Sequence, residues 1–325
     1  MATIKTRILI ISDTHAAPPK PSSGGLDEEL FDPRSYGHAV TGYRVPLPPA
    51  DVVLHAGDLT RRGRPQELRD AFSMIQDIDA PLKIVIAGNH DLCLDPRYED
   101  ISADTSSADA AAKIVKDAES HGVRYLDEGT YTFDLDNGAR LSVYASPWTP
   151  QYGYWAFQYS QGHSFAIPPG VDIAMTHGPP YGVLDLAGGG GRSERAGCRD
   201  LYAAVRRAKP RVHCFGHIHE AWGAYLAGWK ESFSPEGIDA EASKTVANLD
   251  TMRPLTTDSQ DVQNEKMAKL RDIARRRGME LDLTQGVHRV DPGEQTLFVN
   301  AAIMDISYRP VQPPWIIDID LPPAT

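Results

Sequence analysis

The amino-acid sequence predicts an α/β protein in which buried β-sheets are covered by helices. Short runs of apolar, β-forming residues recur along the 325-residue chain, and each run ends in a polar or glycine-rich turn. Stretches with helical periodicity lie between some of these runs. Because the runs are almost continuously apolar, we expect both faces of the strands to be buried, as in sheets that carry helices. With 41% hydrophobic residues, the chain can fill such a core.

The expected strands follow one another along the chain. They are "RILIIS" (7–12), "DVVLHAGD" (51–58), "KIVIAGNHD" (83–91), "LSVYASP" (141–147), "DIAMTHG" (172–178), "RVHCFGH" (211–217), "QTLFVNAAI" (295–303) and "PPWIIDIDL" (313–321). Helices are expected at 65–78 and 108–120, between strands. No apolar run approaches the roughly 18 residues of a membrane-spanning helix, so no membrane association is expected.

Two segments differ in composition from this pattern. Residues 16–50 are rich in proline, glycine and serine and are expected to form a long surface loop. Residues 228–295 are polar and include an expected helix at 258–277 that Gly278 ends. We interpret the whole chain, 1–325, as one domain with this loop and a polar, partly helical insertion. The sequence leaves open whether the insertion is a lid, a dimer contact or a decoration.

The charge and the cysteines limit the classes of function. The chain has 44 acidic and 33 basic residues and a net charge of −11, which argues against binding of nucleic-acid polymers. A small anionic substrate remains compatible if bound metal cations supply positive charge locally. Cys93, Cys198 and Cys214 lie far apart, which argues against a disulfide framework and a cysteine zinc site. A reducing, cytoplasmic setting is expected.

Polar residues with metal-binding or catalytic chemistry follow five of the expected strands. Strand ends of α/β sheets form the ligand crevice, so these side chains are expected to converge. The Asp-x-His and His-x-His spacings place two side chains on the same side of an extended segment. The residues are Asp13 and His15, then Asp58, then Asn89, His90 and Asp91, then His177, and finally His217 and His219.

This set of side chains indicates a site for two metal ions. Carboxylate, amide and imidazole ligands without thiolate suit Mn, Fe, Zn or similar ions. Seven ligands are too many for one tetrahedral ion but fit two ions that share a bridging carboxylate. Two such ions form a clamp for in-line displacement at phosphorus.

Several of these motifs together resemble those of a known superfamily. They are "LHAGDLT", "KIVIAGNHD", "SPWTPQYGYWAF", "THGPP" and "FGHIHEAWG". The sequence is similar to the calcineurin-like metallophosphoesterase superfamily. More narrowly, it resembles the metallophosphoesterase-domain-containing proteins related to class III cyclic-nucleotide phosphodiesterases. The resemblance covers about residues 7–15, 51–91, 131–222 and 296–320.

The resemblance implies a fold, a mechanism and roles for individual residues. The fold is a sandwich of two β-sheets flanked by helices. A hydroxide that bridges the two ions attacks phosphorus, while His90 stabilises the transition state or protonates the leaving oxygen. Asp13, His15 and His219 would bind the first metal, Asp58 would bridge the two, and Asn89, His177 and His217 would bind the second.

The sequence departs from the family pattern at one position. Many members carry an acidic residue three positions after the bridging Asp, where it orients the catalytic His, but here the residue is Arg61. Asp91 is a candidate replacement. Arg61 and Arg192 are candidate contacts of the substrate phosphate, although a solvated loop arginine is the favoured interpretation of Arg61. Both histidines of the Gly-His-x-His motif are present, which favours activity.

Other conspicuous residues are interpreted as structural. His55 and His213 lie inside apolar runs and are expected to be hydrogen-bonded core residues, and Cys214 a small core residue. The glycine-rich run 188–195 lacks a phosphate-loop ending and is expected to be a loop near the site mouth. The aromatic run 147–157 is expected to pack under the site, with base stacking by Trp148 or Tyr152 as the alternative.

These observations predict a dinuclear-metal phosphoester hydrolase, with two Mn, Fe or Zn ions as cofactors. A phosphodiesterase acting on small phosphodiesters is favoured, with cyclic nucleotides as the leading class by analogy with the family alone. The alternatives are a phosphomonoesterase for a small metabolite or phosphoprotein, and a catalytically silent metal-binding scaffold. The partner is expected to be a small phosphoester, and a homodimer is left open.

Overall fold

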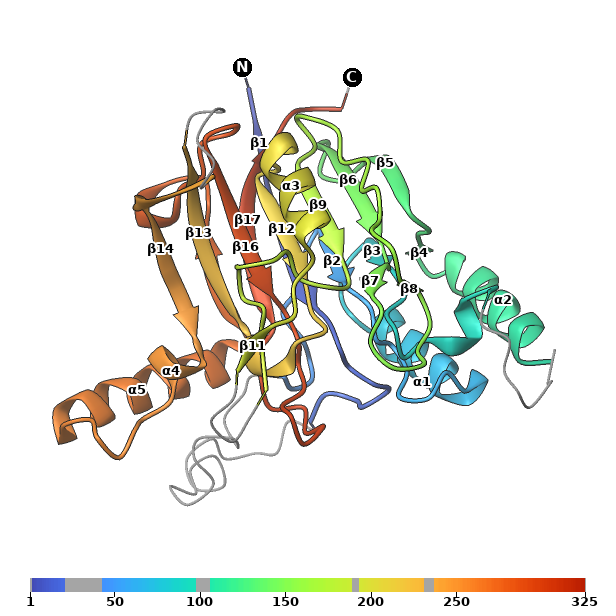
Figure 1. Cartoon of the computed structure of the whole chain (residues 1–325), viewed down its shortest axis with the longest axis horizontal. Helices are drawn as coiled ribbons and strands as arrows, with labels where there is room; N and C mark the ends of the chain where they lie inside the picture. Colours follow the sequence, from blue (N-terminus) through green and yellow to red (C-terminus); the bar gives the residue numbers. More distant parts are fainter. Residues whose placement is uncertain (1, 21–42, 98–105, 189–192, 231–236, 325) are drawn as a thin grey trace.

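The computed structural model describes residues 2–20, 43–97, 106–188, 193–230 and 237–324. Two large β-sheets lie face to face, with helices on their outer sides (Figure 1). One sheet has six strands in the order β15 (Met279–Asp282), β17 (Trp315–Leu321), β1 (Ile4–Ile11), β2 (Val52–His55), β3 (Leu82–Val85) and β4 (Val123–Tyr125). The predicted α/β sandwich of two sheets flanked by helices is confirmed.

The second sheet has seven strands. Their order is β14 (Ile238–Asn248), β13 (Gly223–Trp229), β16 (Gln295–Asn300), β12 (Val212–Phe215), β9 (Ile173–Thr176), β6 (Arg140–Ser146) and β5 (Gly129–Asp134). Two small pairs join β7 (Thr149–Pro150) with β8 (Gln158–Tyr159) and β10 (Leu186–Ala187) with β11 (Glu194–Arg195).

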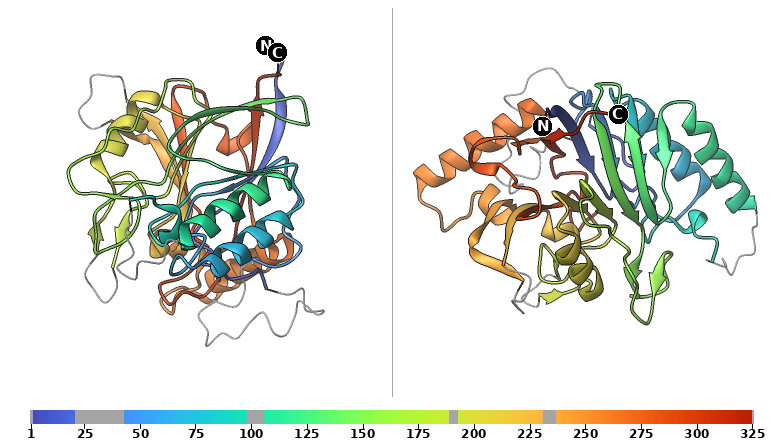
Figure 2. Two further views of the ribbon diagram at one scale, coloured as in Figure 1. Left: turned by 90° about the vertical axis from the view of Figure 1, so that its right-hand side faces the viewer. Right: turned by 90° about the horizontal axis from the view of Figure 1, so that it is seen from above.

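One set of four parallel strands in each sheet ends at the same side of the molecule. β1 to β4 are parallel neighbours in one sheet, and β6, β9, β12 and β16 are parallel neighbours in the other. Their carboxyl ends lie at the bottom of Figure 1, whereas the two chain termini lie together at the top. Figure 2 also shows the termini close together. At this end of the molecule β1 and β17 pair in antiparallel fashion, starting from Ile4 and Leu321.

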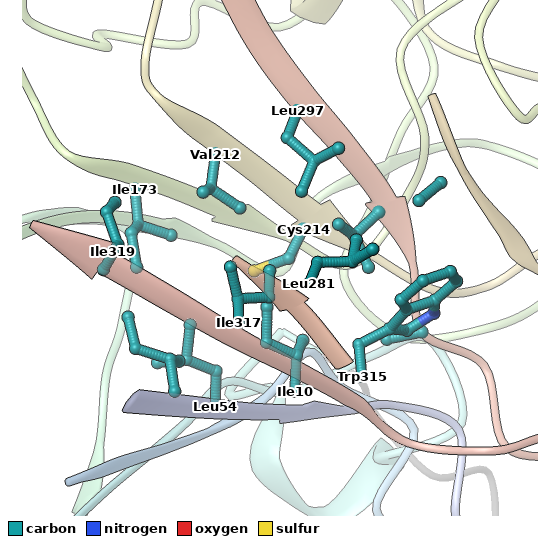
Figure 3. Packing of buried hydrophobic residues seen from close by; sticks show 14 of the residues in the cluster. Ile10, Leu54, Ile173, Val212, Cys214, Leu281, Leu297, Trp315, Ile317 and Ile319 are labelled. Atoms are coloured by element: carbon teal, nitrogen blue, oxygen red, sulfur yellow. The ribbon is translucent and has the colours of Figure 1, made fainter. Parts of the chain in front are cut away.

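The interior between the sheets is a continuous apolar layer. Alternate residues of the central strands face this layer, and fully burying each such side chain contributes about 1.5–3 kcal/mol. Cys214 lies in it with no exposed surface, as predicted for a small core residue. Figure 3 shows Ile10, Leu54, Ile317 and Ile319 of one sheet facing Ile173, Val212 and Leu297 of the other.

Helices cover the outer faces because each carries one apolar stripe. In α1 (Pro65–Gln76), Leu68, Phe72 and Ile75 recur at helical spacing and pack with α2 (Ser106–Glu119) against the six-stranded sheet. Pro65 begins α1 at the position that helices tolerate best. α3 (Arg199–Ala208) packs through Leu201 and its neighbours on the seven-stranded sheet. Figure 2 shows α1 and α2 side by side.

The polar segment 228–295 contributes strands as well as the expected helix. The helix is α5 (Gln260–Arg276), preceded by the short α4 (Leu249–Met252). α5 ends one residue earlier than predicted, because Arg277 rather than Gly278 adopts the left-handed conformation, with φ 62°. The segment also supplies β14 and β15, which the sequence analysis missed because several residues of β14 are exposed and polar.

The expected surface loop 16–50 lies partly outside the described residues, at 21–42. At its described end, Tyr43 is fully buried and joins an apolar cluster with Leu47, so this end packs against the sandwich rather than extending over it. In the described parts of the chain, no helix has both the length and the apolar character that crossing a membrane requires.

Candidate active site

The predicted site residues converge at the carboxyl ends of the parallel strands. Asp13 and His15 follow β1, Asp58 follows β2, and Asn89 and His90 follow β3. From the other sheet, His177 follows β9, and His217 and His219 follow β12. All of these side chains are buried except that of His217, which is partly exposed. The site therefore lies where the two sheets meet.

The backbone at several of these residues is strained. Asp13, His15, Asp58 and His217 have φ values of 53°, 46°, 55° and 68°, in the left-handed region that non-glycine residues rarely adopt. Such residues cost about 1–3 kcal/mol each and persist only where surrounding structure holds them. Neighbouring Gly216 provides the space, because a Cβ atom there would collide with the carboxylate of Asp13.

Three histidines hold a backbone carbonyl with one ring nitrogen and turn the other toward the site. The Nδ1 atoms of His15, His177 and His219 lie 2.8, 2.9 and 3.0 Å from the carbonyl oxygens of Thr60, Ala56 and Asp305. A carbonyl only accepts, so each Nδ1 must donate its proton. Each Nε2 is thereby left as a lone pair in the neutral ring, the state required of a metal ligand.

One set of ligand atoms surrounds a point between the sheets. The Nε2 atoms of His15 and His219 are 3.3 Å apart, and Nε2 of His219 is 3.4 Å from Oδ1 of Asp13. Two lone pairs this close repel each other unless a cation lies between them. Asp13, His15 and His219 form a group that could hold a metal ion, and they are the residues expected at the first metal.

Asp58 faces both expected metal positions. Its Oδ2 lies 3.7 Å from Nε2 of His15, and its Oδ1 lies 3.4 Å from Nε2 of His177. One carboxylate oxygen toward each position is the geometry of a bridging ligand. Asp13, Asp58 and His177 form the second group able to hold an ion.

The remaining expected ligands lie beside His177. Oδ1 of Asn89 is 3.0 Å from Nε2 of His177. The ring of His217 is 5.0 Å from that of His177, centroid to centroid, and its backbone N–H donates to the carboxylate of Asp13. The seven expected ligands are therefore gathered in one place, and their chemistry fits two cations.

The electrostatics of the site favour positive charge. Burial opposes ionisation of Asp13, but its hydrogen bond with His219 and the nearby His177 lower its pKa to about 2. Burial also favours the neutral ring of His177, but the charge of Asp58 and their hydrogen bond outweigh it and raise the pKa of His177 to about 9. A proton therefore occupies His177 beside the carboxylates, and a metal ion bound there would replace it.

His90 is held differently from the expected ligands. Its backbone N–H donates to Oδ1 of Asp58 at 2.8 Å, and its Nδ1 lies 2.8 Å from the carbonyl oxygen of Arg61. The ring packs on Trp155 with the centroids 4.1 Å apart. The backbone of Arg61, not an acidic side chain, therefore orients His90.

Asp91 does not orient His90, so this prediction is wrong. Both of its oxygens are taken by donors from the loops after β2 and β3: the N–H groups of Gly88, Leu59 and Thr60 and the hydroxyl of Thr60, at 2.8–3.1 Å. Burial, followed by the charge of Asp58, raises the pKa of Asp91 to about 6. Asp91 ties the two loops together.

Of the two arginines predicted to contact substrate, the structure describes only Arg61. Arg61 is exposed, and its guanidinium lies over the ring of Tyr308, 4.8 Å from the centroid. Arg192 lies outside the described residues. Arg195, three residues further along the chain, donates to the buried carboxylate of Asp185 at 2.6 Å.

The histidines interpreted as structural lie in the core, whereas the glycine-rich run 188–195 lies partly outside the described residues, at 189–192. His55 and His213 are fully buried, and each Nε2 is 2.9 Å from a threonine hydroxyl, of Thr14 and Thr176 respectively. In the aromatic run, Trp148 packs on Phe157 at 5.4 Å between centroids. Tyr152 is the exception, since it is 57% exposed and borders the site.

A recess of about 250 Å³ opens over the metal-ligand candidates. It is lined by Asp58, Asn89, His90, Tyr152, His217, His219, Glu220, Ile306 and Tyr308. Ile306 and Tyr308 were not predicted, and neither was Asp305, whose carbonyl oxygen contacts His219. These residues follow no apolar strand directly and belong to no motif. A larger cavity of about 650 Å³ lies near the chain termini, and none of the expected ligands lines it.

Several known proteins are similar in sequence to this chain. The family model of the calcineurin-like phosphoesterases matches residues 6–221. The chain is 33% identical over 232 residues to metallophosphoesterase domain-containing protein 1 of Homo sapiens, covering 69% of this chain and 63% of that protein. It is 32% identical over 198 residues to UPF0046 protein T07D4.2 of Caenorhabditis elegans, covering 56% of this chain and 49% of that protein.

The chain thus spans less than two thirds of the length of these relatives. Among solved structures, the phosphopantetheinyl hydrolase of Mycobacterium tuberculosis is similar with a TM-score of 0.34 and 15% identity, over 65% of this chain and 82% of that one.

Proposed function

The chain belongs to the calcineurin-like phosphoesterase family, and from this premise we propose that it is a phosphodiesterase that uses two metal ions. The observation that carries the proposal is the ligand geometry: three histidines donate Nδ1 to carbonyls and present Nε2 beside two buried carboxylates. The Nδ1 hydrogen bonds to carbonyls orient the three rings before any metal ion binds, as is usual for histidine ligands. We further propose small phosphodiesters, such as cyclic nucleotides, as substrates.

The ligands divide between two positions. Asp13, His15 and His219 would hold one ion, Asn89, His177 and His217 the other, and Asp58 would hold both. Mn, Fe and Zn suit these ligands. When bound, two such cations supply an activated water for attack on phosphorus and positive charge for the phosphoryl oxygens.

The role of His90 in this proposal is to donate a proton or hydrogen bond. The carbonyl of Arg61 holds its Nδ1 proton, so the ring can donate toward the recess only through a protonated Nε2. The ring also packs at a tilt against Trp155, which limits its movement. His90 would thus stabilise charge on a phosphoryl oxygen or protonate the leaving oxygen.

The volume of the recess and the net charge of the chain support a small substrate. The recess of about 250 Å³ is smaller than the roughly 300–1,000 Å³ of pockets that enclose drug-sized ligands. The net charge of −11 opposes binding of polyanions.

The test combines metal analysis with a substrate panel. We expect close to two transition-metal ions per chain and Mn²⁺-dependent hydrolysis of bis(p-nitrophenyl) phosphate and cyclic nucleotides in preference to p-nitrophenyl phosphate. Asp58→Asn should abolish hydrolysis while circular dichroism remains unchanged. Preference for the monoester would make the protein a phosphomonoesterase. Bound metal without any hydrolysis would make it a silent scaffold, and absence of metal would overturn the site.

A further inference from the structure

The recess over the site has a polar floor and apolar walls. The floor is formed by metal-ligand candidates and His90, and the walls include Tyr152, Ile306 and Tyr308. Tyr152 is 57% exposed and Ile306 is 67% exposed. Covering such apolar surface is favourable by about 25 cal/mol per Å². Charged groups are also near, since Glu220 lines the recess and the guanidinium of Arg61 lies over the ring of Tyr308. The three walls themselves present binding energy to an apolar group.

Tyr308 is a fixed wall. Its φ of 57° is unusual for a bulky residue, and its N–H donates to the carbonyl of Asp305 at 2.9 Å. The carboxylate of Asp305 in turn accepts two hydrogen bonds from the guanidinium of Arg309, at 2.8 and 2.7 Å. The ring of Tyr308 lies 4.9 Å from that of His15 and 5.2 Å from that of His219.

Tyr152 forms the wall beside the other metal position. It lies in the loop between β7 and β8, where its carbonyl accepts a hydrogen bond from Gln158 at 3.0 Å. Its ring is 5.9 Å from that of His217. Tyr152 and Tyr308 thus neighbour ligand candidates of the two different expected metals, and both line the recess over them.

We propose that Tyr152, Ile306 and Tyr308 form a subsite for a planar apolar group, an aryl or aromatic heterocyclic ring, carried by the phosphorus-bound group of the ligand. This inference rests on the proposed function of the floor. Aromatic side chains favour stacked or edge-on contacts with planar rings. A recess of about 250 Å³ has room for the phosphoryl group and about one ring beside it. Short aliphatic and polyhydroxylated groups would leave the walls uncovered.

The test measures binding rather than turnover. Phenylphosphonate and methylphosphonate lack an ester bond, so neither is hydrolysed, and they differ only in the ring. Titration calorimetry of the Mn²⁺-loaded protein should give a Kd for phenylphosphonate at least tenfold below that for methylphosphonate. Tyr308→Ala and Tyr152→Ala should each reduce this ratio at least threefold, and Tyr308→Phe should preserve it.

Tyr154→Ala is the matched control. Tyr154 belongs to the same loop as Tyr152, is 93% exposed and does not line the recess. Its loss should leave the ratio unchanged. Because the ratio compares two ligands on one protein, damage to the metal floor affects both and cancels.

The outcomes separate the two proposals. Equal affinity for both phosphonates, or an equal fall of the ratio in the Tyr154 variant, overturns the subsite while the phosphoester site stands. If neither phosphonate binds the Mn²⁺-loaded protein, the proposed function fails and the subsite fails with it.

Discussion

Four of the site histidines hold a backbone carbonyl through Nδ1 but differ in what else their rings contact. His15, His177 and His219 hold carbonyls through Nδ1 and converge on carboxylates through Nε2. His90 also holds a carbonyl, but its ring packs between Trp155 and His15 rather than against a carboxylate. Such a ring is available to substrate rather than to a metal. Its orientation depends on a backbone atom, which explains why an arginine is tolerated at position 61.

Replacing His90 should therefore separate catalysis from metal binding. We expect His90→Ala to retain two metal ions and to lose hydrolysis by about 10²–10⁴-fold, the usual contribution of a positioned acid or base. Turnover of the aryl diester and metal content by mass spectrometry check this. His121→Ala, at an exposed histidine after α2, is the control. Loss of metal from the His90 variant would show that His90 is a ligand.

The buried histidine His213 makes stability depend on pH. Burial lowers its pKa from 6.5 to about 3. Because the folded pKa is below the unfolded one, the full stability is present above pH 6.5 and is lost as the pH falls toward 3. At 1.36 kcal/mol per pH unit, acidification to pH 5 should cost about 2 kcal/mol through this residue.

The measurement compares urea unfolding of the wild type and His213→Gln at pH 7.5 and pH 5, both with EDTA. The difference between the two proteins isolates His213 from the other titrating groups. The variant, unable to take up this proton, should lose about 2 kcal/mol less on acidification. Equal losses in the two proteins would mean that His213 takes up a proton as readily in the folded state as in the unfolded state, so that burial does not lower its pKa.

At the scale of elements, the sequence could predict the strands that carry the site. β2, β9 and β12 are buried along their whole length, so they appear as unbroken apolar runs with a polar motif after each. β14 could not be found in this way, since an edge strand with one solvated side has no such run. The division into two sheets came from the family resemblance, because periodicity does not show which strands pair.

The position of Tyr308 at the site could not be predicted from sequence motifs. It lies 89 residues after His219 in the sequence and reaches the site through a short turn after β16, held by Asp305 and Arg309. Neither spacing nor composition marks this turn. The prediction that Asp91 orients His90 failed for a related reason. Although Asp91 is next to His90 in the sequence, its oxygens accept hydrogen bonds from loop N–H groups and not from the neighbouring ring.

The turn after β3 offers a test of how tightly the elements shape the site. Gly88 does not need a left-handed backbone, but a Cβ atom there would lie 2.6 Å from Cε1 of His177 and would also collide with Asp58. Gly88→Ala should therefore displace two expected ligands and weaken Mn²⁺ binding at least tenfold, with unchanged circular dichroism.

Gly129→Ala, at the start of β5, is the control for the Gly88 variant. A Cβ atom there would meet only the ring of Tyr131 at 3.4 Å, an ordinary contact. Calorimetric titration with Mn²⁺ compares the two variants. Normal affinity in the Gly88 variant would show that the strand ends can spread without cost, and the close fit around Asp58 would then have no role in metal binding.

At the scale of the whole molecule, the two ends of the sandwich are held together differently. At the end with the termini, β1 and β17 pair from Ile4 and Leu321 onward. At the other end, the expected ligands come from both sheets: Asp13, His15, Asp58 and Asn89 from one, and His177, His217 and His219 from the other. Bound ions would connect the sheets there and neutralise the paired carboxylates.

Metal removal should therefore loosen one end of the molecule selectively. An ion present at 1,000 times its Kd stabilises the folded state by about 4 kcal/mol, so EDTA should lower the unfolding temperature measurably. Hydrogen exchange should increase at residues 12–16, 56–60, 87–91 and 216–219, which lie at the strand ends, because local opening costs least where cross-links are lost. Residues 4–8 and 317–321 should keep their protection, since their ladder is independent of the ions. Uniform loss of protection, or none at all, would contradict a metal connection between the sheets, and restoring Mn²⁺ should reverse the selective pattern.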